Sequence, residues 1–168
     1  MRYLVVLLLA GCASDMVKVA EPASVVITWD RREPVGATVA ADFKTCRITA
    51  PETVDDAALG QEFRRCFGFV GAGRATRAPT ATLTTNDMVK VAEPRRVVVT
   101  WAREAPTIVT CRNERIDGRS LRGCAQVARD HSRCRIIAHE FIYDSVLGHE
   151  LRHCFGWHHD ADLKLRAK

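Results

Sequence analysis

The pattern of apolar positions predicts two short strands and one helix, and this pattern occurs twice along the chain. β-Branched and aromatic residues fill 25–29 and 97–101, and such residues suit the pleated, half-buried surface of a strand. A second strand is expected in each half, around residues 46–49 and 134–137. Together the elements predict an α+β fold built from short antiparallel strands and helices.

The helix of each half is predicted to follow its second strand. It runs from about Val54 to Cys66 in the first half and from Asp144 to Cys154 in the second. Apolar residues recur along both helices at i, i+4 and i+7, so they lie on one face. They are Leu59, Phe63 and Cys66 in the first helix, and Leu147, Leu151 and Cys154 in the second.

Each predicted helix contains one glycine and is followed by another. Gly60 and Gly148 lie inside the helices, where glycine costs about 1 kcal/mol relative to alanine. We therefore expect a strand backbone to pass close to both. Gly68 and Gly156 are expected to end the helices in the left-handed conformation.

The two halves also share sequence. Residues 15–22 return unchanged as 87–94, an offset of 72, and residues 59–69 resemble 147–157, an offset of 88. The second copy therefore carries 16 extra residues (88 minus 72). We interpret the chain as a tandem duplication of a small, disulfide-stapled unit. The predicted parts are a signal peptide (1–11), a degenerate first copy without metal ligands (12–69), a linker rich in Gly, Ala, Thr and Pro (70–86), and a second, metal-binding copy (87–168).

The N-terminus has the features of a bacterial lipoprotein signal. A basic start precedes the apolar run 3–10, which is too short to span a bilayer, and residues 9–12 match a lipobox. Cleavage before Cys12 and acylation of its thiol would tether the mature chain to a membrane. Ala13 resembles the sorting signal for the outer membrane, so we expect a lipid-anchored protein of the bacterial cell envelope, on the periplasmic side of that membrane. The alternative is that residues 3–10 form a buried apolar strand.

Six further cysteines indicate disulfides, because an even number in an exported small protein is typical of an oxidised framework. The expected pairs are Cys46–Cys66, Cys134–Cys154 and Cys111–Cys124. Each pair would contribute about 2–4 kcal/mol. The competing role of Cys154 as a zinc ligand is disfavoured, since its counterpart Cys66 is present in a copy that lacks every histidine.

The net charge is +5, and many of the arginines lie between Arg103 and Arg135. We interpret them as a solvated basic surface; the alternative is that they contact anionic polymers of the envelope. No nucleic-acid motif accompanies them, and export argues against that partner. We therefore expect no nucleic-acid binding.

The second helix carries the candidate chemistry, in the pattern HExxHxxGxxH. His149 and His153 are four residues apart, so a helix places both imidazoles on one side, where they can bind one metal ion. Glu150 would lie beside a metal-bound water and take its proton. His159 is the expected third ligand of a Zn²⁺ ion; His158 is the alternative, and Asp160 or Asp162 come after it.

The first copy serves as an internal comparison for these residues. The four histidines of the second copy are replaced in the first copy by Gln61, Arg65, Val70 and Gly71. Of the candidate site residues, only the glutamate is kept, as Glu62 opposite Glu150. The scaffold therefore does not require the histidines, which favours a functional role for them.

Through the motif from His149 to His159 the second copy resembles the zincin metallopeptidases, and most closely the metzincins. The whole chain also resembles small exported or lipid-anchored metallopeptidase-like proteins of bacteria and their phages. It departs from metzincins because Met1, Met16 and Met88 are its only methionines and none supplies a methionine turn.

The resemblance implies hydrolysis of a peptide bond by a zinc-activated water, with Glu150 as general base. The substrate would be a protein or the peptide part of the cell wall. Tyr143 is a candidate oxyanion donor, or else an aromatic packing residue at the start of the helix. The alternative function is a non-catalytic envelope lipoprotein, in which zinc or disulfides only stabilise a small binding module.

Overall fold

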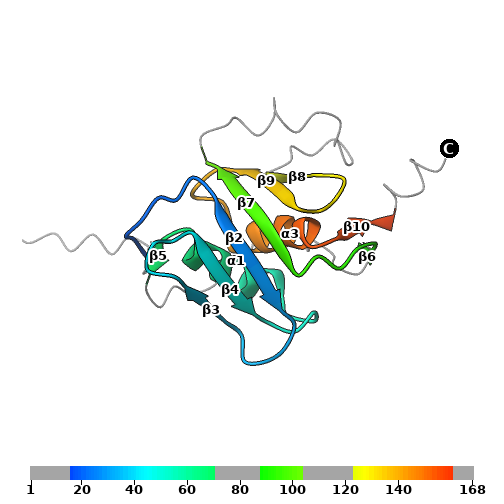
Figure 1. The fold of residues 1–168 in the computed structure, drawn as a ribbon, viewed down its shortest axis with the longest axis horizontal. Coiled ribbons are helices and arrows are strands. Elements are labelled where there is room, and N and C mark those ends of the chain that lie inside the picture. Colours follow the sequence, from blue (N-terminus) through cyan, green and yellow to red (C-terminus); the bar gives the residue numbers. More distant parts are fainter. Residues whose placement is uncertain (1–15, 71–87, 104–122, 161–168) are drawn as a thin grey trace, which may run out of the picture.

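A six-stranded mixed sheet with two helices packed on one face forms the centre of the molecule (Figure 1). The structure is a computed structural model, and it describes residues 16–70, 88–103 and 123–160. The elements of the first half are β1 (Val17–Lys18), β2 (Val25–Asp30), β3 (Gly36–Val39), β4 (Thr45–Thr49), α1 (Asp56–Cys66) and β5 (Phe69–Val70). Those of the second half are β6 (Met88–Lys90), β7 (Arg96–Ala102), β8 (Gly123–Val127), β9 (Arg133–Ala138), α3 (Asp144–Cys154) and β10 (Trp157–His159).

The predicted α+β class and both helices are confirmed, but the expectation of purely antiparallel strands is wrong. The strand order is β3-β4-β2-β7-β9-β8, and the pairs β2–β4 and β7–β9 are parallel. The reason is the path of the chain in the first half. After β2 it forms the edge strand β3 and then returns as β4 between β3 and β2, so β4 runs in the direction of β2. In the second half β9 likewise lies between β8 and β7.

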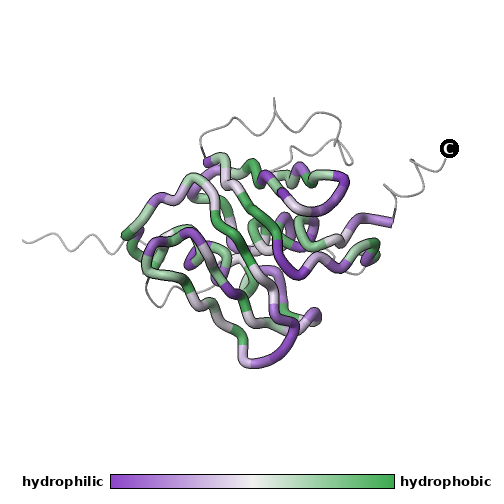
Figure 2. The backbone as a smooth tube through the Cα atoms, in the orientation of Figure 1, coloured by the Kyte–Doolittle hydropathy of each residue, from purple (hydrophilic) through white to green (hydrophobic). Residues whose placement is uncertain are grey.

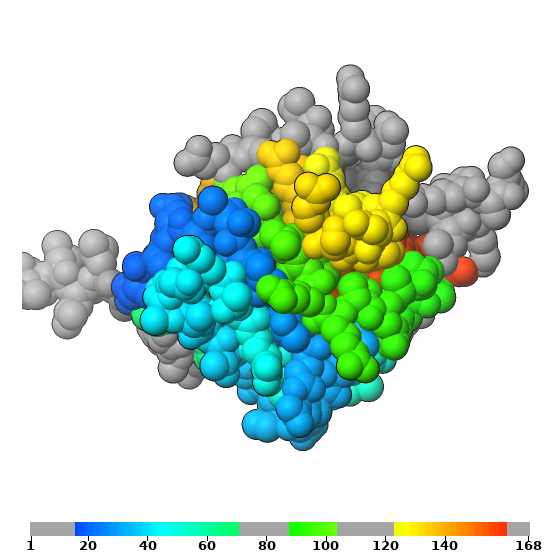
Figure 3. Space-filling view, in the orientation of Figure 1, coloured from blue at the N-terminus to red at the C-terminus, as the bar shows by residue number. Residues whose placement is uncertain are grey.

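The sheet is continuous across the two halves of the chain. β2 pairs with β7 in antiparallel register, and the pair Val26–Val98 lies at the centre with Val25–Val99 and Ile27–Val97 on either side. Apolar residues concentrate along these two central strands (Figure 2). On the open face of the sheet, residues of the first half (blue and cyan) lie beside those of the second half (green and yellow) (Figure 3). One hydrophobic core therefore serves both halves.

Aromatic residues of each half pack against the other half. The ring of Trp29 lies edge-on to Phe155, with centroids 5.4 Å apart, and Phe63 lies 5.3 Å from Trp101. Trp29 and Trp101 each donate the indole N–H to a backbone carbonyl at 2.9 Å, to that of Ala50 and that of Ala138 respectively. Their polar atoms are thus satisfied inside the core.

α1 and α3 cross at their internal glycines. A methyl group on Gly60 would lie 1.8 Å from the carbonyl oxygen of Asp144, and one on Gly148 would lie 1.9 Å from that of Asp56. The expected close approach is therefore real, but the approaching backbone belongs to the other helix rather than to a strand.

Gly68 and Gly156 end the two helices at φ of 88° and 90°, as predicted. A methyl group on either would lie 2.3 Å from a carbonyl oxygen, that of Ala20 or Ala92. After these turns the chain forms β5, which pairs with β1, and β10, which pairs with β6.

Two of the predicted disulfides are present. Cys46–Cys66 joins β4 to the last residue of α1, with Cα atoms 5.5 Å apart. Cys134–Cys154 joins β9 to the last residue of α3, with Cα atoms 5.4 Å apart. Cys124 lies in β8, whereas its expected partner Cys111 is outside the described residues. The predicted signal peptide with Cys12 is also outside them. Neither described helix is long and apolar enough to cross a membrane.

Candidate metal centre

Three imidazoles converge where α3 meets β10. His149 and His153 lie one turn apart on α3, His159 lies on β10, and one nitrogen of each is within 4.8 Å of the others. The Nε2 atoms of His149 and His159 are 3.1 Å apart. Nitrogens bound to one tetrahedral zinc at about 2.0–2.1 Å would be separated by about 3.3–3.4 Å. Within the described ranges this is the one group of three or more His, Cys, Asp or Glu side chains that could hold a metal ion.

The pairing of β6 with β10 determines whether His158 or His159 lies in the histidine cluster. These strands lie side by side next to α3, in a register that pairs His159 with Met88 and His158 with Val89 (Figure 1). Successive side chains of a strand point to opposite faces, so His158 and His159 diverge. The structure brings His159 into the cluster, as the sequence predicts, and places the ring of His158 6.2 Å from that of His131.

Hydrogen bonding orients His153 for metal binding. Its Nδ1 lies 2.7 Å from the carbonyl oxygen of Trp157, a distance at which an N–H at Nδ1 donates to the carbonyl. The Nε2 atom then keeps its lone pair for a cation. A ligand imidazole whose other nitrogen is fixed in this way is typical of metal sites.

Burial keeps His153 neutral. It lowers the pKa of this imidazole to about 3, helped by the neighbouring His149 and opposed by the hydrogen bond to Trp157. A metal ion binds only the neutral form of imidazole. At neutral pH His153 is therefore in the protonation state that a ligand requires.

Glu150 is buried between α3 and the edge strand β8. A methyl group on Gly123 would lie 3.5 Å from Cγ of Glu150 and 3.0 Å from Cγ1 of Val146, so the two elements pack closely at this point. The glycine therefore leaves room for the glutamate side chain. The predicted general base is thus held in the protein rather than extended into solvent.

The first half presents a different set of side chains at the same places. Gln61 and Arg65 stand where α3 has its two histidines, and Val70 lies in β5, paired with Val17. Glu62 is buried and bound to Arg65 at 2.7 Å. Burial raises the pKa of Glu62, and the Arg65 guanidinium opposes this rise.

Tyr143, the predicted oxyanion donor, is the N-cap of α3. It makes no side-chain capping hydrogen bond, whereas its counterpart Asp55 accepts one from the Ala58 N–H at 2.8 Å. Tyr143 precedes His149 by six residues, about 9 Å along a helix axis. Its role as an oxyanion donor stays a prediction.

Sequence reasoning missed two buried residues beside the cluster, Asp56 and Arg152. Arg152 lies between His149 and His153 in the sequence of α3, and its Nε donates to Oδ1 of Asp56 in α1 at 2.6 Å. Oδ2 of Asp56 lies 3.5 Å from Nδ1 of His149. One signal was available, because an aspartate and an arginine stand at matching positions of both helices: Asp56 and Arg64 in α1, Asp144 and Arg152 in α3.

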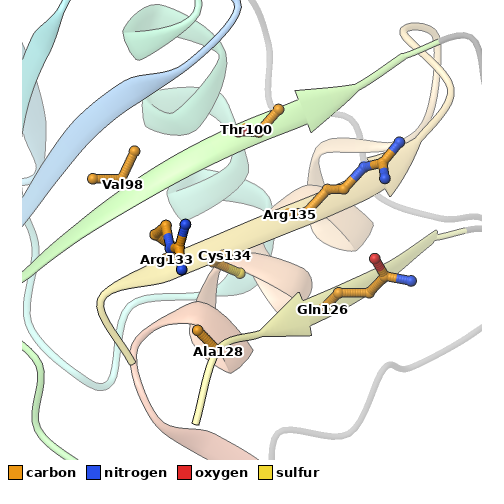
Figure 4. A pocket seen from close by; sticks show the side chains of 7 residues that line it. All are labelled: Val98, Thr100, Gln126, Ala128, Arg133, Cys134 and Arg135. Atoms are coloured by element: carbon orange, nitrogen blue, oxygen red, sulfur yellow. The ribbon is translucent and has the colours of Figure 1, made fainter. Parts of the chain in front are cut away.

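A shallow hollow lies on the open face of the sheet, over β7, β9 and β8 (Figure 4). Its lining includes the basic side chains of Arg133 and Arg135 and the amide of Gln126, but no histidine or carboxylate. This hollow therefore offers no metal ligand of the kind found in the histidine cluster.

Comparison with known proteins gives no match: no family model, no curated protein and no solved structure is similar to this chain. The histidine cluster, Glu150 and the contacts around them are the observations from which a function can be inferred.

Proposed function

We propose that the protein is a membrane-tethered, zinc-dependent metallopeptidase of the zincin type that acts outside the cytoplasm. The observation that carries this proposal is the convergence of His149, His153 and His159. Glu150, the residue after His149 on α3, is buried. The comparison with the first half supports it, because the same scaffold forms there without any of the three imidazoles.

Zinc is the metal that the donor set suits best. Three neutral imidazoles fit a tetrahedral Zn²⁺ ion and leave its fourth position open, as in catalytic sites, whereas structural sites are usually closed by four protein ligands. A zinc ion held there would supply a bound water with a pKa near 7 and an electrophile for a carbonyl group.

The residues of the chain supply the proton transfers. Glu150 takes the proton of the attacking water and passes it to the leaving amine. Tyr143 is the proposed hydrogen-bond donor to the carbonyl oxygen that gains charge. The substrate class is a protein or the peptide part of the cell wall.

Anchoring through an acylated Cys12 would place this activity on the periplasmic side of the bacterial outer membrane. The signal-peptide pattern of residues 1–11 supports this location. We also infer that the two halves arose by tandem duplication. The matching helices, disulfides and parallel strand pairs support this origin.

One observation favours a second function, a non-catalytic envelope lipoprotein. Glu62 shows that a glutamate at this position of the helix also occurs without metal ligands, where it binds Arg65. In that case Glu150 would stabilise the fold, and zinc or the disulfides would only support a small binding module.

A matched set of variants separates the two functions. The mature chain, carrying Cys12→Ser to prevent acylation, is purified under oxidising conditions, and its zinc content and hydrolysis of fluorescently labelled casein are measured. The variants are His153→Ala and Glu150→Gln, with the first-half controls Arg65→Ala and Glu62→Gln.

For a peptidase we expect one zinc per chain in the parent, loss of zinc in His153→Ala, and retention of zinc in Glu150→Gln. Hydrolysis should fall about 10²–10⁴-fold in Glu150→Gln, the usual contribution of a general base. Both first-half controls should keep zinc and activity. Zinc binding without hydrolysis in the parent would instead identify the non-catalytic module.

A further inference from the structure

We propose that the first half completes the metal centre, with Asp56 as the carboxylate that orients the ligand His149. This inference rests on the proposed zinc site. Asp56 is the first residue of α1, and its side chain reaches across the helix pair to within 3.5 Å of Nδ1 of His149. Both residues are buried, at 7 % and 4 % exposure, so water does not screen the contact.

Arg152 fixes the position of the aspartate. Its Nε donates to Oδ1 at 2.6 Å, and its two terminal nitrogens donate to the backbone carbonyls of Glu52, at 2.9 Å, and of Val54. The guanidinium therefore holds the whole segment that leads into α1. With Oδ1 bound to Arg152, it is Oδ2 that faces His149.

A second contact from the other half holds the same segment. Nζ of Lys90 in β6 lies 2.6 Å from Oε1 of Glu52. β6 pairs with β10, the strand that carries His159. The segment 52–56 is thus tied to both elements that carry the imidazoles. The contacts of this segment with Arg152 and Lys90 thus hold the Asp56 carboxylate next to His149.

The chemistry of metal-bound histidine gives this contact its role. A ligand imidazole usually donates its second N–H to a carboxylate or a carbonyl, which fixes the tautomer and raises the basicity of the metal-binding nitrogen. His153 uses the Trp157 carbonyl for this purpose. Asp56 provides the corresponding acceptor for His149, and it provides it from the half that has no metal ligands.

The opposite side of the helix pair offers a matched comparison. Arg64 donates to Oδ1 of Asp144 at 2.6 Å and to the carbonyls of Glu140 and Ile142, the same set of contacts with the halves exchanged. On that side Gln61 replaces His149. The Asp–Arg contact therefore serves the packing of both helices, and an imidazole faces the carboxylate on one side only.

The test compares Asp56→Asn with Asp144→Asn in the mature full-length chain. Zinc affinity is measured by competition with a chromophoric chelator, and stability by urea unfolding of the metal-free proteins. We expect both variants to lower the unfolding midpoint to a similar extent. Asp56→Asn should weaken zinc binding about 10–100-fold, the usual effect of losing such a carboxylate, and Asp144→Asn by less than about 3-fold.

Equal zinc affinities for the two variants would overturn the inference while leaving the zinc site intact. A parent that binds no zinc would overturn both the inference and the proposed function. A second measurement does not require the variants to fold. In the zinc-loaded parent, ¹⁵N NMR of the imidazoles should show His149 protonated at Nδ1 and bound through Nε2, and coordination through Nδ1 would contradict the role of Asp56.

Discussion

Glu62 and Arg65 form an ion pair on the first helix, with Nη1 of the arginine 2.7 Å from one carboxylate oxygen and 2.8 Å from the other. Their counterparts on the second helix are Glu150 and His153. The position of the Arg65 guanidinium in the first half is taken in the second half by an imidazole of the histidine cluster. The same position of the fold thus has a glutamate paired with an arginine in the first half and a glutamate next to a histidine cluster in the sequence of the second half.

The choice of third ligand can be tested with neighbouring residues. His159→Ala removes a nitrogen that lies 3.1 Å from Nε2 of His149, whereas His158→Ala removes a ring on the other face of β10. We expect His159→Ala to weaken zinc binding by more than about 100-fold, since it removes a direct ligand. His158→Ala should change it by less than about 3-fold. Chelator competition measures both, and the reverse ranking would assign the ligand to His158.

The helix crossing predicts a large effect of two small substitutions. Gly60→Ala and Gly148→Ala each place a methyl group within 2 Å of a backbone oxygen, so the helices must separate. We expect each to lower the free energy of unfolding by about 3 kcal/mol or more, which exceeds the gain of about 1 kcal/mol from helix propensity. Gly36→Ala is the control, because nothing lies within 4 Å of its added methyl group.

Urea unfolding of the three glycine variants provides the measurement. The Gly36→Ala variant should stay within about 0.5 kcal/mol of the parent. If Gly60→Ala and Gly148→Ala were equally harmless, the close crossing of α1 and α3 would be wrong.

The disulfides should contribute similarly to stability but differently to the site. Cys46–Cys66 and Cys134–Cys154 each close a loop with a sequence separation of 20, so removing either pair by double serine substitution should cost about 3 kcal/mol. Only Cys134–Cys154 anchors the helix that carries two imidazoles. We therefore expect its loss to weaken zinc binding more than loss of Cys46–Cys66, and similar zinc affinities would show that α3 is positioned without its disulfide.

The neutral state of His153 predicts how the metal-free protein responds to acid. Its folded pKa of about 3 lies below the value of 6.5 for an unperturbed histidine, so between these pH values the unfolded chain binds one more proton at this residue. The free energy of unfolding should therefore fall as the pH is lowered through this window, by up to about 1.4 kcal/mol per pH unit for this one proton.

Urea unfolding of the metal-free protein between pH 7 and pH 4 can be compared with the same series for His153→Gln. We expect a shallower pH dependence in the variant, because glutamine does not titrate. Identical slopes would mean that His153 is protonated in the folded protein, contrary to its burial.

Much of this structure is predictable from local patterns. The strand runs, the helix bounds and the glycine stops depend on nearby residues, and the structure confirms them. The pairs Cys46–Cys66 and Cys134–Cys154 follow from the packing of each helix on its own strand. The grouping of His159 with the helix histidines follows from motif spacing.

The features that sequence reasoning missed are contacts between the halves. Local patterns do not show that β2 pairs with β7, that Gly60 packs on Gly148, or that a carboxylate of α1 reaches an imidazole of α3. The parallel pairing of β2 and β4 was missed for a related reason. It depends on β3 taking the edge position, and the apolar pattern of residues 36–39 is too weak to predict that strand.

The most direct test of the metal centre is the X-ray absorption spectrum of the zinc-loaded mature chain at the zinc edge. We expect one zinc ion bound by three imidazole nitrogens and one oxygen at about 2.0–2.1 Å. A sulfur neighbour at about 2.3 Å, fewer than three imidazoles, or a chain that retains no zinc after reconstitution would contradict this expectation.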